Sequence, residues 1–262
     1  MCLHANGREC LRSGGRRKVN DLAAGLRGLV RPYVPRGVRR ALADWVWGIR
    51  NLGLPYYRVF GCQRIDGFLL PSNVRELYKI AGEVSGDGAL CVEIGSWVGK
   101  SSIVIAKGLA AGDGGRLHCI DPFNAAGDER SRERYAARFG SRQPDLERLF
   151  RTNVKRFRVS DRIVVQKGYS HDLVSSWQAP IDFLFLDGDH SYEAVLRDFS
   201  DWTPFVKEGG VVAMHDVWLD RPPGEGAYHT GPAEVVTKHV LNNAGYEKVS
   251  YLDSLYVLRK NE

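Results

Sequence analysis

The alternation of helix-like and strand-like segments from Pro71 to the C-terminus is the feature that most constrains the fold. Short apolar runs at residues 90–94, 116–120, 162–166, 181–186 and 210–214 alternate with longer, charged segments of helical pattern. Parallel strands need a crossover connection, which is usually a helix, so this alternation predicts a parallel sheet covered by helices on both faces. The run 181–186 is almost wholly apolar, which is typical of a central strand buried on both faces.

The remaining segments complete an α/β, doubly wound, mostly parallel sheet of seven strands. Residues 246–251 and 255–259 are joined by Asp253-Ser254, which predicts a terminal antiparallel hairpin. A helix over 71–83 is expected to be capped by Ser72. Further helices are expected over 100–111, over 131–158 with an interruption near Pro144, over 192–205, and from Gly231-Pro232 onward. We expect one domain over residues 65–262, preceded by a helical extension over residues 1–64.

The N-terminal extension is strongly basic. Residues 1–50 hold eleven Lys and Arg residues against three acidic ones, whereas the whole chain carries a net charge of +6. Apolar residues recur at roughly helical spacing among the arginines, interrupted by Pro32 and Pro35; they are Leu26, Leu29, Val30, Val38, Leu42, Trp45, Val46 and Ile49. Such a segment favours an accessory helix docked on its own domain or on a partner subunit of a homo-oligomer, and peripheral contact with an anionic membrane is the alternative.

Other partners and compartments are constrained by what the sequence lacks. Basic and aromatic residues do not interleave beyond residue 60, so nucleic acid is not expected as a partner. The five cysteines form no CxxC pair, and Cys91 and Cys119 lie in apolar runs, which indicates a reducing compartment and no structural zinc. No apolar run approaches the roughly 20 residues of a membrane-spanning helix. We therefore expect a soluble, cytoplasmic protein.

Polar residues follow each apolar run, where a parallel sheet places its ligands. In an open α/β sheet ligands bind beyond the carboxyl ends of the strands. The residues at these ends are Glu93, Asp121, the segment from Lys167 to Ser170, the segment from Asp187 to His190, and the pair His215-Asp216. An acid at the end of the second strand, after a glycine loop, is placed to accept hydrogen bonds from both hydroxyls of a ribose. Asp121 fits this role.

The stretch EIGSWVGKS, residues 93–101, looks like a phosphate-binding loop but has the wrong spacing. A Walker loop needs four residues between its first glycine and the Gly-Lys pair, and only three separate Gly95 from Gly99. A dinucleotide fingerprint needs a second glycine where Ser96 stands, so an NAD-dependent dehydrogenase is disfavoured. Both motifs therefore fail on spacing, and the loop is expected to serve a third kind of ligand.

From residue 65 to 260 the pattern resembles the class I S-adenosylmethionine-dependent methyltransferases, and among them the metal-dependent O-methyltransferases of the catechol and macrolide-sugar types. EIGSWVGKS is similar to the first motif of that family, which passes under the methionine part of the cofactor. Asp121 is similar to the ribose-binding acid, and Tyr169 and Ser170 fall where the family contacts adenine. The resemblance implies these cofactor-binding residues: Glu93, Gly95, Ser96, Ser101, Asp121, Tyr169, Ser170 and Asp187.

The resemblance also implies a metal site and a catalytic base. Asp187 corresponds to a metal ligand, and His215-Asp216 to the paired ligands after strand five. His190 corresponds to the base, so His190 and Asp187 are the expected catalytic residues. The relatives have an acid or amide pair where His215 stands, and imidazole favours softer metals than magnesium. His215 is therefore either a ligand for manganese, iron or zinc, or it orients Asp216 or the substrate.

The expected chemistry agrees with these residue types. The sulfonium brings an activated methyl group, so the enzyme must supply a deprotonated oxygen in line with it. A divalent ion lowers the pKa of a bound hydroxyl, and a histidine titrating near neutrality accepts the proton. The other histidines considered, His118, His171 and His229, are expected on the surface or in loops, and Trp97 and Trp218 are as readily packing residues as pocket aromatics.

Methyl transfer from S-adenosylmethionine to a hydroxyl of a small molecule, assisted by Mg²⁺ or Mn²⁺, is the leading hypothesis for the function. A sugar or a glycosylated natural product is the substrate class that the resemblance suggests. One alternative is metal-independent methyl transfer with His190 as the sole base. Another is a nonenzymatic cofactor-binding or assembly protein anchored by the basic extension, which the full set of polar strand ends argues against.

Overall fold

The computed structural model describes residues 35–139, 144–221 and 229–262. The chain divides into two compact units, Met1–Val46 and Trp47–Glu262, and the second contains the whole sheet. Leu26, Leu29, Val30 and Pro32 of the basic extension fall outside the described residues, as do two of the five cysteines, Cys2 and Cys10. Within the described part of the chain, no helix is long and apolar enough to cross a membrane.

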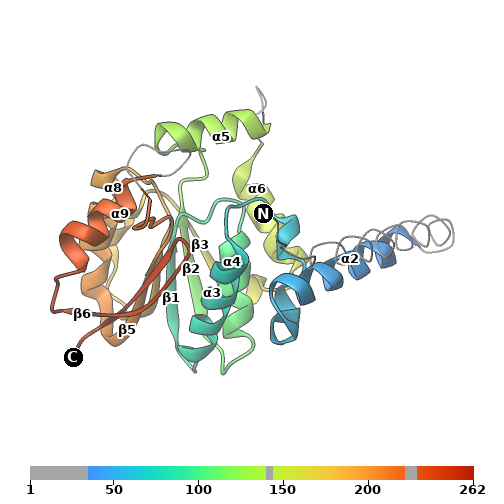
Figure 1. Ribbon diagram of the computed structural model, residues 1–262, viewed down its shortest axis with the longest axis horizontal. Coiled ribbons are helices and arrows are strands. Elements are labelled where there is room, and N and C mark those ends of the chain that lie inside the picture. The colour runs from blue at the N-terminus through green and yellow to red at the C-terminus, as the bar shows by residue number, and fades with distance from the viewer. Residues whose placement is uncertain (1–34, 140–143, 222–228) are drawn as a thin grey trace, which may run out of the picture. The chain divides into compact units, whose positions relative to one another are not determined.

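The sheet has seven strands in the order β3-β2-β1-β4-β5-β7-β6 (Figure 1). The strands are β1 Leu90–Ile94, β2 Arg116–Asp121, β3 Ile163–Lys167, β4 Ile181–Leu186, β5 Val206–Met214, β6 Tyr246–Leu252 and β7 Leu255–Lys260. The first five are parallel, and β7 pairs antiparallel with both β5 and β6. The predicted fold class and the terminal hairpin are thereby confirmed.

Most helices follow the expected pattern, with differences at their ends. The α-helices are α2 Arg36–Asn51, α3 Pro71–Glu83, α4 Lys100–Leu109, α5 Glu129–Phe139, α6 Leu146–Arg156, α7 Ser170–Leu173, α8 Tyr192–Trp202 and α9 Gly231–Val235. Short 3₁₀ helices lie at Leu54–Val59, Cys62–Arg64, Ser160–Arg162, Val174–Ser176 and Thr203–Phe205, and a π-helical turn at Val236–Val240.

Three details of the helix predictions need correction. The cap of α3 is Leu70, not Ser72: the Leu70 N–H donates to Asn73 Oδ1 (3.0 Å), while the Ser72 hydroxyl donates to Asp253. The segment expected as one interrupted helix over 131–158 contains two helices, and Asp145 begins the second by accepting a hydrogen bond from the Arg148 N–H at 2.9 Å. The helix expected to reach residue 205 ends at Trp202, and a 3₁₀ turn follows.

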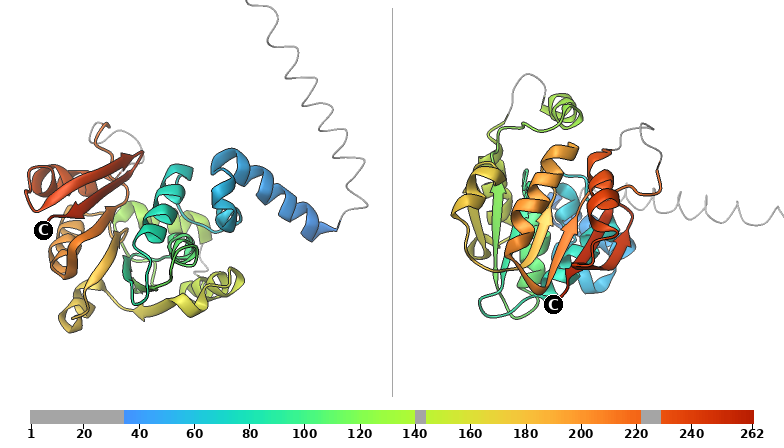
Figure 2. Two further views of the ribbon diagram at one scale, coloured as in Figure 1. Left: turned by 90° about the horizontal axis from the view of Figure 1, so that it is seen from below. Right: turned by 90° about the vertical axis from the view of Figure 1, so that its left-hand side faces the viewer.

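Two hydrophobic clusters lie on opposite faces of the sheet, because side chains alternate along each strand. On β1, Cys91 belongs to the cluster covered by α3, α4 and α6, whereas Val92 belongs to the cluster covered by α8 and α9 (Figure 2). The first cluster also takes in buried residues of the segment 52–65, among them Val59 and Phe60. By the same alternation Glu93 faces α4, in the middle of the first cluster.

Gly95 brings the loop after β1 into direct contact with the end of β4. The hydrogen bonds between neighbouring strands continue past the strand ends here. The Gly95 N–H donates to Ile120 O and the Asp187 N–H donates to Ile94 O, each at 2.9 Å. Gly95 has φ 88°, and a Cβ at this position would lie 2.0 Å from the carbonyl oxygen of Asp187. Both the positive φ and the lack of space require glycine.

Gly95→Ala is expected to destabilise the protein by about 2 kcal/mol or more, because a Cβ forces β1 and β4 apart at their carboxyl ends. Urea unfolding measures the loss. Gly86→Ala is the matched control, since a Cβ at Gly86 meets nothing within 4 Å. Equal stability of the two variants would contradict the close approach.

Candidate active site

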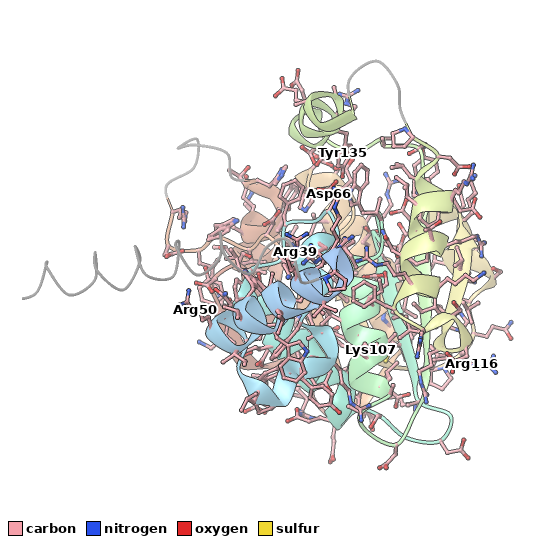
Figure 3. The ribbon with its side chains drawn as sticks, turned by 90° about the vertical axis from the view of Figure 1, so that its right-hand side faces the viewer. Arg39, Arg50, Asp66, Lys107, Arg116 and Tyr135 are labelled. Atoms are coloured by element: carbon pink, nitrogen blue, oxygen red, sulfur yellow. The ribbon has the colours of Figure 1, made fainter. Side chains whose placement is uncertain are left out.

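A cavity of about 320 Å³ opens at the carboxyl ends of the parallel strands, within the usual range for ligand pockets. It is lined by all but one of the residues that the sequence singled out for the site: Gly95, Ser96, Ser101, Asp121, Tyr169, Ser170, Asp187, His190, His215 and Asp216. Glu93 is the exception. Figure 3 labels Asp66 and Tyr135, which also line this cavity, and at the other end of the domain Lys107 and Arg116.

Asp121 joins the loops that form one wall of the cavity. Its Oδ2 accepts hydrogen bonds from the backbone N–H groups of Ser96 (2.9 Å) and Trp97 (2.8 Å), and its Oδ1 accepts one from Phe123 (2.6 Å). Burial raises the pKa of Asp121, although the three backbone donors act in the opposite direction. The carboxylate thus fixes the glycine loop, and its expected contact with a ribose stays a prediction.

Glu93 lies beneath the glycine loop, away from the cavity. It is fully buried on the α4 side of β1, where the Ser102 hydroxyl donates to its carboxylate. Burial raises its pKa to about 7, against the opposing effect of nearby serine hydroxyls. Glu93 therefore lies where it supports the loop, and its expected contact with the cofactor stays a prediction.

The free energy of unfolding should fall as the pH rises from the pKa of Glu93 in the unfolded chain toward its pKa of about 7 in the folded protein. Its pKa is about 7 in the folded protein and lower when the chain is unfolded, so the folded state holds a proton that the unfolded state has released. Raising the pH from about 5 to about 8 should therefore cost stability, and Glu93→Gln should remove this part of the loss. Urea unfolding at both pH values tests it, with the exposed Glu208→Gln as control. A pH dependence identical in Glu93→Gln and the native protein would contradict the assignment.

His190 stands between three carboxylates. Its Nδ1 lies 3.4 Å from Asp128 Oδ2, and its Nε2 lies 3.5 Å from Asp187 Oδ1 and 3.4 Å from Asp216 Oδ2. Both ring nitrogens are buried, and neither forms a hydrogen bond with a described residue. Burial lowers the pKa of His190, but the three acids outweigh it and raise the pKa to about 10. Without a bound cation the ring is therefore charged at neutral pH.

His215 is held by protein groups at both nitrogens. Its Nδ1 lies 2.9 Å from Asp187 Oδ1, and its Nε2 lies 3.4 Å from the Ser254 hydroxyl. Burial raises the pKa of Asp187, yet the positive charge of His215 and His190 outweighs burial, and the pKa is lowered. Asp216, the next residue, has a positive φ of 53°, a strained conformation of the kind found at functional sites. These contacts place the His215 ring against Asp187, and its expected role, as a metal ligand or as a residue that orients Asp216 or the substrate, stays a prediction.

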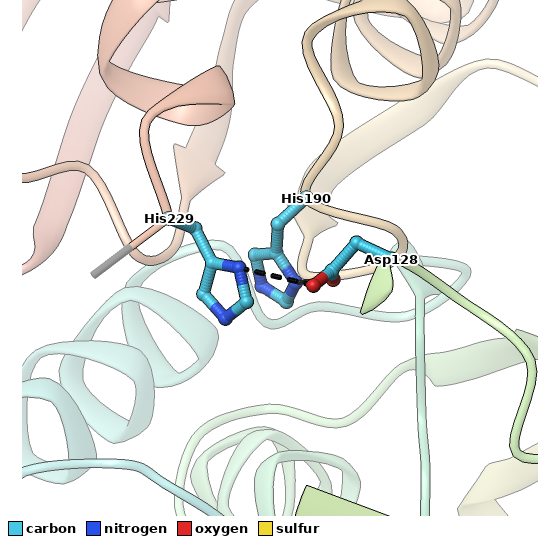
Figure 4. Close-up of side chains that lie close together, drawn as sticks. All are labelled: Asp128, His190 and His229. Carbon is cyan, nitrogen blue, oxygen red and sulfur yellow. Dashed lines mark ion pairs between the residues drawn. The ribbon is translucent and has the colours of Figure 1, made fainter. Parts of the chain in front are cut away.

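Asp128 and His229 join this cluster, and the sequence analysis did not anticipate them (Figure 4). Asp128 precedes α5 and accepts hydrogen bonds from the Ser131 N–H (3.0 Å) and hydroxyl (2.7 Å). His229 lies in a loop, one of the two places expected for it, but the side chain is buried, and its Nδ1 lies 3.3 Å from Asp128 Oδ1. Its ring stacks on that of His190 with centroids 4.2 Å apart. The sequence carries one local sign of Asp128: an acid directly before a helix and three residues before a serine is typical of a helix N-cap.

At the other end of the cavity the expected adenine-contacting residues make polar contacts of their own. The Tyr169 hydroxyl accepts a hydrogen bond from Asn124 Nδ2 at 2.8 Å, and the Ser170 hydroxyl donates to Asp198. Burial raises the pKa of Asp198 to about 6. These contacts fix both side chains at the carboxyl end of β3.

An aromatic pair closes the cavity from the side of α5. Tyr135 of α5 stacks on Trp97 of the glycine loop with ring centroids 3.9 Å apart and planes 15° from parallel. Trp97 has a positive φ of 48°. Burial raises the pKa of Tyr135, and the charge of Asp187 adds to the increase. Trp97 is therefore part of the cavity wall, and its stacking partner Tyr135 was not expected from the sequence pattern.

The family comparison agrees with this site. Residues 92–217 match a family described as a methyltransferase domain, and this segment contains β1 to β5 with the glycine loop and the acids at the strand ends. The match covers just under half of the chain, and it agrees with the methyltransferase part of the resemblance drawn from the sequence.

Solved structures, among them O-methyltransferases, share the fold at low sequence identity. The O-methyltransferase TomG from Streptomyces achromogenes, involved in tomaymycin synthesis and in complex with SAM, has a TM-score of 0.57 and is 15% identical, covering 87% of this chain and 100% of its own. Cofactor-bound Rv0187 from MTB has a TM-score of 0.55 and is 16% identical, covering 84% and 96%. The O-methyltransferase NovP has a TM-score of 0.54 and is 20% identical, covering 73% and 81%.

A curated sequence relative matches only part of this chain. It is the uncharacterized protein R132 of Acanthamoeba polyphaga mimivirus, which is 26% identical over 140 residues. The match spans 53% of this chain and 57% of the viral protein, little more than half of each.

Proposed function

We propose that this methyltransferase transfers the methyl group of S-adenosylmethionine to a hydroxyl oxygen of a small molecule, with His190 as the general base. The observation that carries the proposal is the convergence of His190, Asp187 and Asp216 at the wall of the cavity, next to the glycine loop. The similarity to O-methyltransferases solved with SAM and with SAH, TomG and the Bacillus cereus enzyme, supports the choice of cofactor and acceptor atom.

The cofactor would lie along the carboxyl ends of β1, β2 and β3. In this proposal the loop at Gly95, Ser96 and Ser101 contacts the methionine part. The carboxylate of Asp121 contacts the ribose, and Tyr169 and Ser170 contact the adenine. Asp121 already accepts three backbone hydrogen bonds, but each carboxylate oxygen has two acceptor sites, so it retains capacity for a ribose hydroxyl. Glu93 contributes by holding the loop from below.

A divalent ion fits the acids on the Nε2 side of His190. Asp187 and Asp216 offer carboxylate oxygens, the ligands that Mg²⁺ and Mn²⁺ prefer, and Mg²⁺ is commonly bound by only one or two carboxylates. His215 was expected as a third ligand; since its nitrogens lie against Asp187 and Ser254, we propose that it orients Asp187. When bound, the ion lowers the pKa of the substrate hydroxyl.

The same arrangement prepares His190 to accept a proton. The acids hold its pKa near 10, which leaves the ring charged and unable to act as a base at neutral pH. Once Asp187 and Asp216 serve as ligands, they stabilise the imidazolium less, and the neutral ring becomes accessible. Asp128 remains at Nδ1 to stabilise the charge that develops when His190 takes the substrate proton.

We also propose a substrate class and a cellular compartment. The similarity to TomG, a protein of tomaymycin synthesis, favours a natural product as substrate, and the resemblance to macrolide-sugar enzymes favours a sugar hydroxyl. The buried free thiols Cys62, Cys91 and Cys119 suit the reducing cytoplasm. A homo-oligomer, a domain boundary near residue 64 and peripheral membrane contact through the basic extension remain proposals from the sequence.

Metal-independent transfer is the second candidate, and one observation favours it. Among the described residues, the donor atoms of Asp187, His215 and Asp216 do not form a group lying wholly within 4.8 Å. In that case His190 acts alone and Asp187 contacts the amino group of the cofactor.

His190→Gln should lower kcat by about 10²- to 10⁴-fold, because the substrate proton loses its acceptor. Affinity for S-adenosylhomocysteine, measured by calorimetry, should stay within about twofold, since the ring lies outside the proposed cofactor contacts. His239→Gln, on the exposed end of the domain beyond α9, is the control. Undiminished turnover in His190→Gln would rule out the proposed base, and cofactor binding without transfer to any hydroxyl substrate would favour the nonenzymatic alternative.

Chelation separates the two catalytic candidates. Treatment with EDTA should abolish turnover, and added Mg²⁺ or Mn²⁺ should restore it, because the hydroxyl and His190 both depend on the ion. Asp216→Asn should raise the Mg²⁺ concentration needed for half-maximal activity. Full activity in EDTA would establish the metal-independent reaction instead.

A further inference from the structure

We propose that Asp128, His190 and His229 form a separate binding site for a divalent transition-metal ion of the zinc class. Among the described residues, this is the group of three His, Cys, Asp or Glu side chains whose potential ligand atoms all lie within 4.8 Å of one another. It lies on the Nδ1 side of His190, whereas the acids proposed for Mg²⁺ lie on the Nε2 side.

The distances in the group fit coordination better than hydrogen bonding. Bonds of about 2.0–2.2 Å in tetrahedral coordination place neighbouring ligand atoms about 3.3–3.6 Å apart. Asp128 lies 3.4 Å from His190 Nδ1 and 3.3 Å from His229 Nδ1. Charge-assisted hydrogen bonds between these groups would measure about 2.7–2.9 Å. The two rings thus approach different oxygens of Asp128, Oδ2 and Oδ1, at separations suited to ligands of a shared ion, and one ligand atom from each of the three residues lies within 4.8 Å of the others.

The buried nitrogens of His190 provide an independent observation. Both are shielded from solvent and lack hydrogen bonds to described residues, an arrangement that costs free energy unless a partner is supplied. The side chain of His229 is only 6% exposed, and that of Asp128 14%. A cation held by Asp128 and the two rings would give His190 Nδ1 a direct bond in place of its 3.4 Å ion pair with Asp128.

The ligand types determine which ion the site prefers. Two imidazole nitrogens and one carboxylate favour zinc, iron, cobalt or nickel over magnesium, which requires oxygen ligands. Three protein ligands leave a position for water, as in many zinc sites. Each imidazole binds through a lone pair in its own plane, so the rings, now stacked 21° from parallel, must tilt apart when the ion binds.

The ligands come from three separate parts of the chain. Asp128 precedes α5, His190 follows β4, and His229 precedes α9. A bound ion therefore ties the segment before α5 to the carboxyl end of β4 and to the segment before α9. It also occupies His190, so if the proposed function is correct, Zn²⁺ inhibits methyl transfer. Only this last consequence rests on the proposed function.

Metal titration of the full chain tests the site without cofactor or substrate. Calorimetry with Zn²⁺ should show binding of one ion per chain. The visible absorption spectrum of bound Co²⁺ should have the intensity of a site with four or five ligands. His229→Gln and Asp128→Asn should each weaken Zn²⁺ binding at least tenfold, and His239→Gln should leave it unchanged. Circular dichroism of each variant verifies folding, and two variants on different segments guard against the failure of one.

Three outcomes would overturn the site: no Zn²⁺ binding by the native protein, unchanged affinity in both ligand variants, or loss of binding only in Asp216→Asn. The last would place zinc at the acids proposed for Mg²⁺. The enzymatic consequence is measured separately, as inhibition by Zn²⁺ that is relieved at least tenfold in His229→Gln. Because binding is read without turnover, failure of the site and failure of the methyltransferase proposal give different results.

Discussion

The close approach of Gly95 to the backbone of Asp187 is the constraint on which the site depends. It brings the loop after β1 against the end of β4, where a side chain on residue 95 would collide with a carbonyl oxygen. Asp121 then fixes the same loop from β2 through three backbone donors. With three strand ends held together in this way, the glycine loop is a fixed part of the cavity wall, and the side chains of Asp187 and His190 start from fixed positions.

The electrostatics of the site follow from crowding several acids around few cations. Asp128, Asp187 and Asp216 all approach His190, and His215 neutralises Asp187 from the opposite side. Such a cluster is costly to bury unless its charges are paired. The histidines provide that pairing in the free protein, and cations would provide it when bound. The chemistry proposed here is thus an exchange of protons for metal ions among one set of acids.

The sequence predicted the sheet, its strand ends and most of the cavity lining, because apolar runs and the residues that end them are local features. It could not predict that Glu93 lies beneath the loop, since that depends on which face of β1 packs against α4. Nor could it predict the contacts of His215 with Ser254, or of Asp128 with His229, which join residues far apart in the chain. Only the folded arrangement of β7, α5 and α9 brings those partners together.

The pairing of β7 with β5 bears on how this protein can be divided. The family match ends at residue 217, yet β5 obtains its outer hydrogen-bonding partner from residues 256–259. A fragment cut at the family boundary would leave the backbone of Val211–Met214 as an open sheet edge, with apolar side chains on both faces. Such edges promote aggregation. The smallest soluble piece must therefore extend through the C-terminal hairpin.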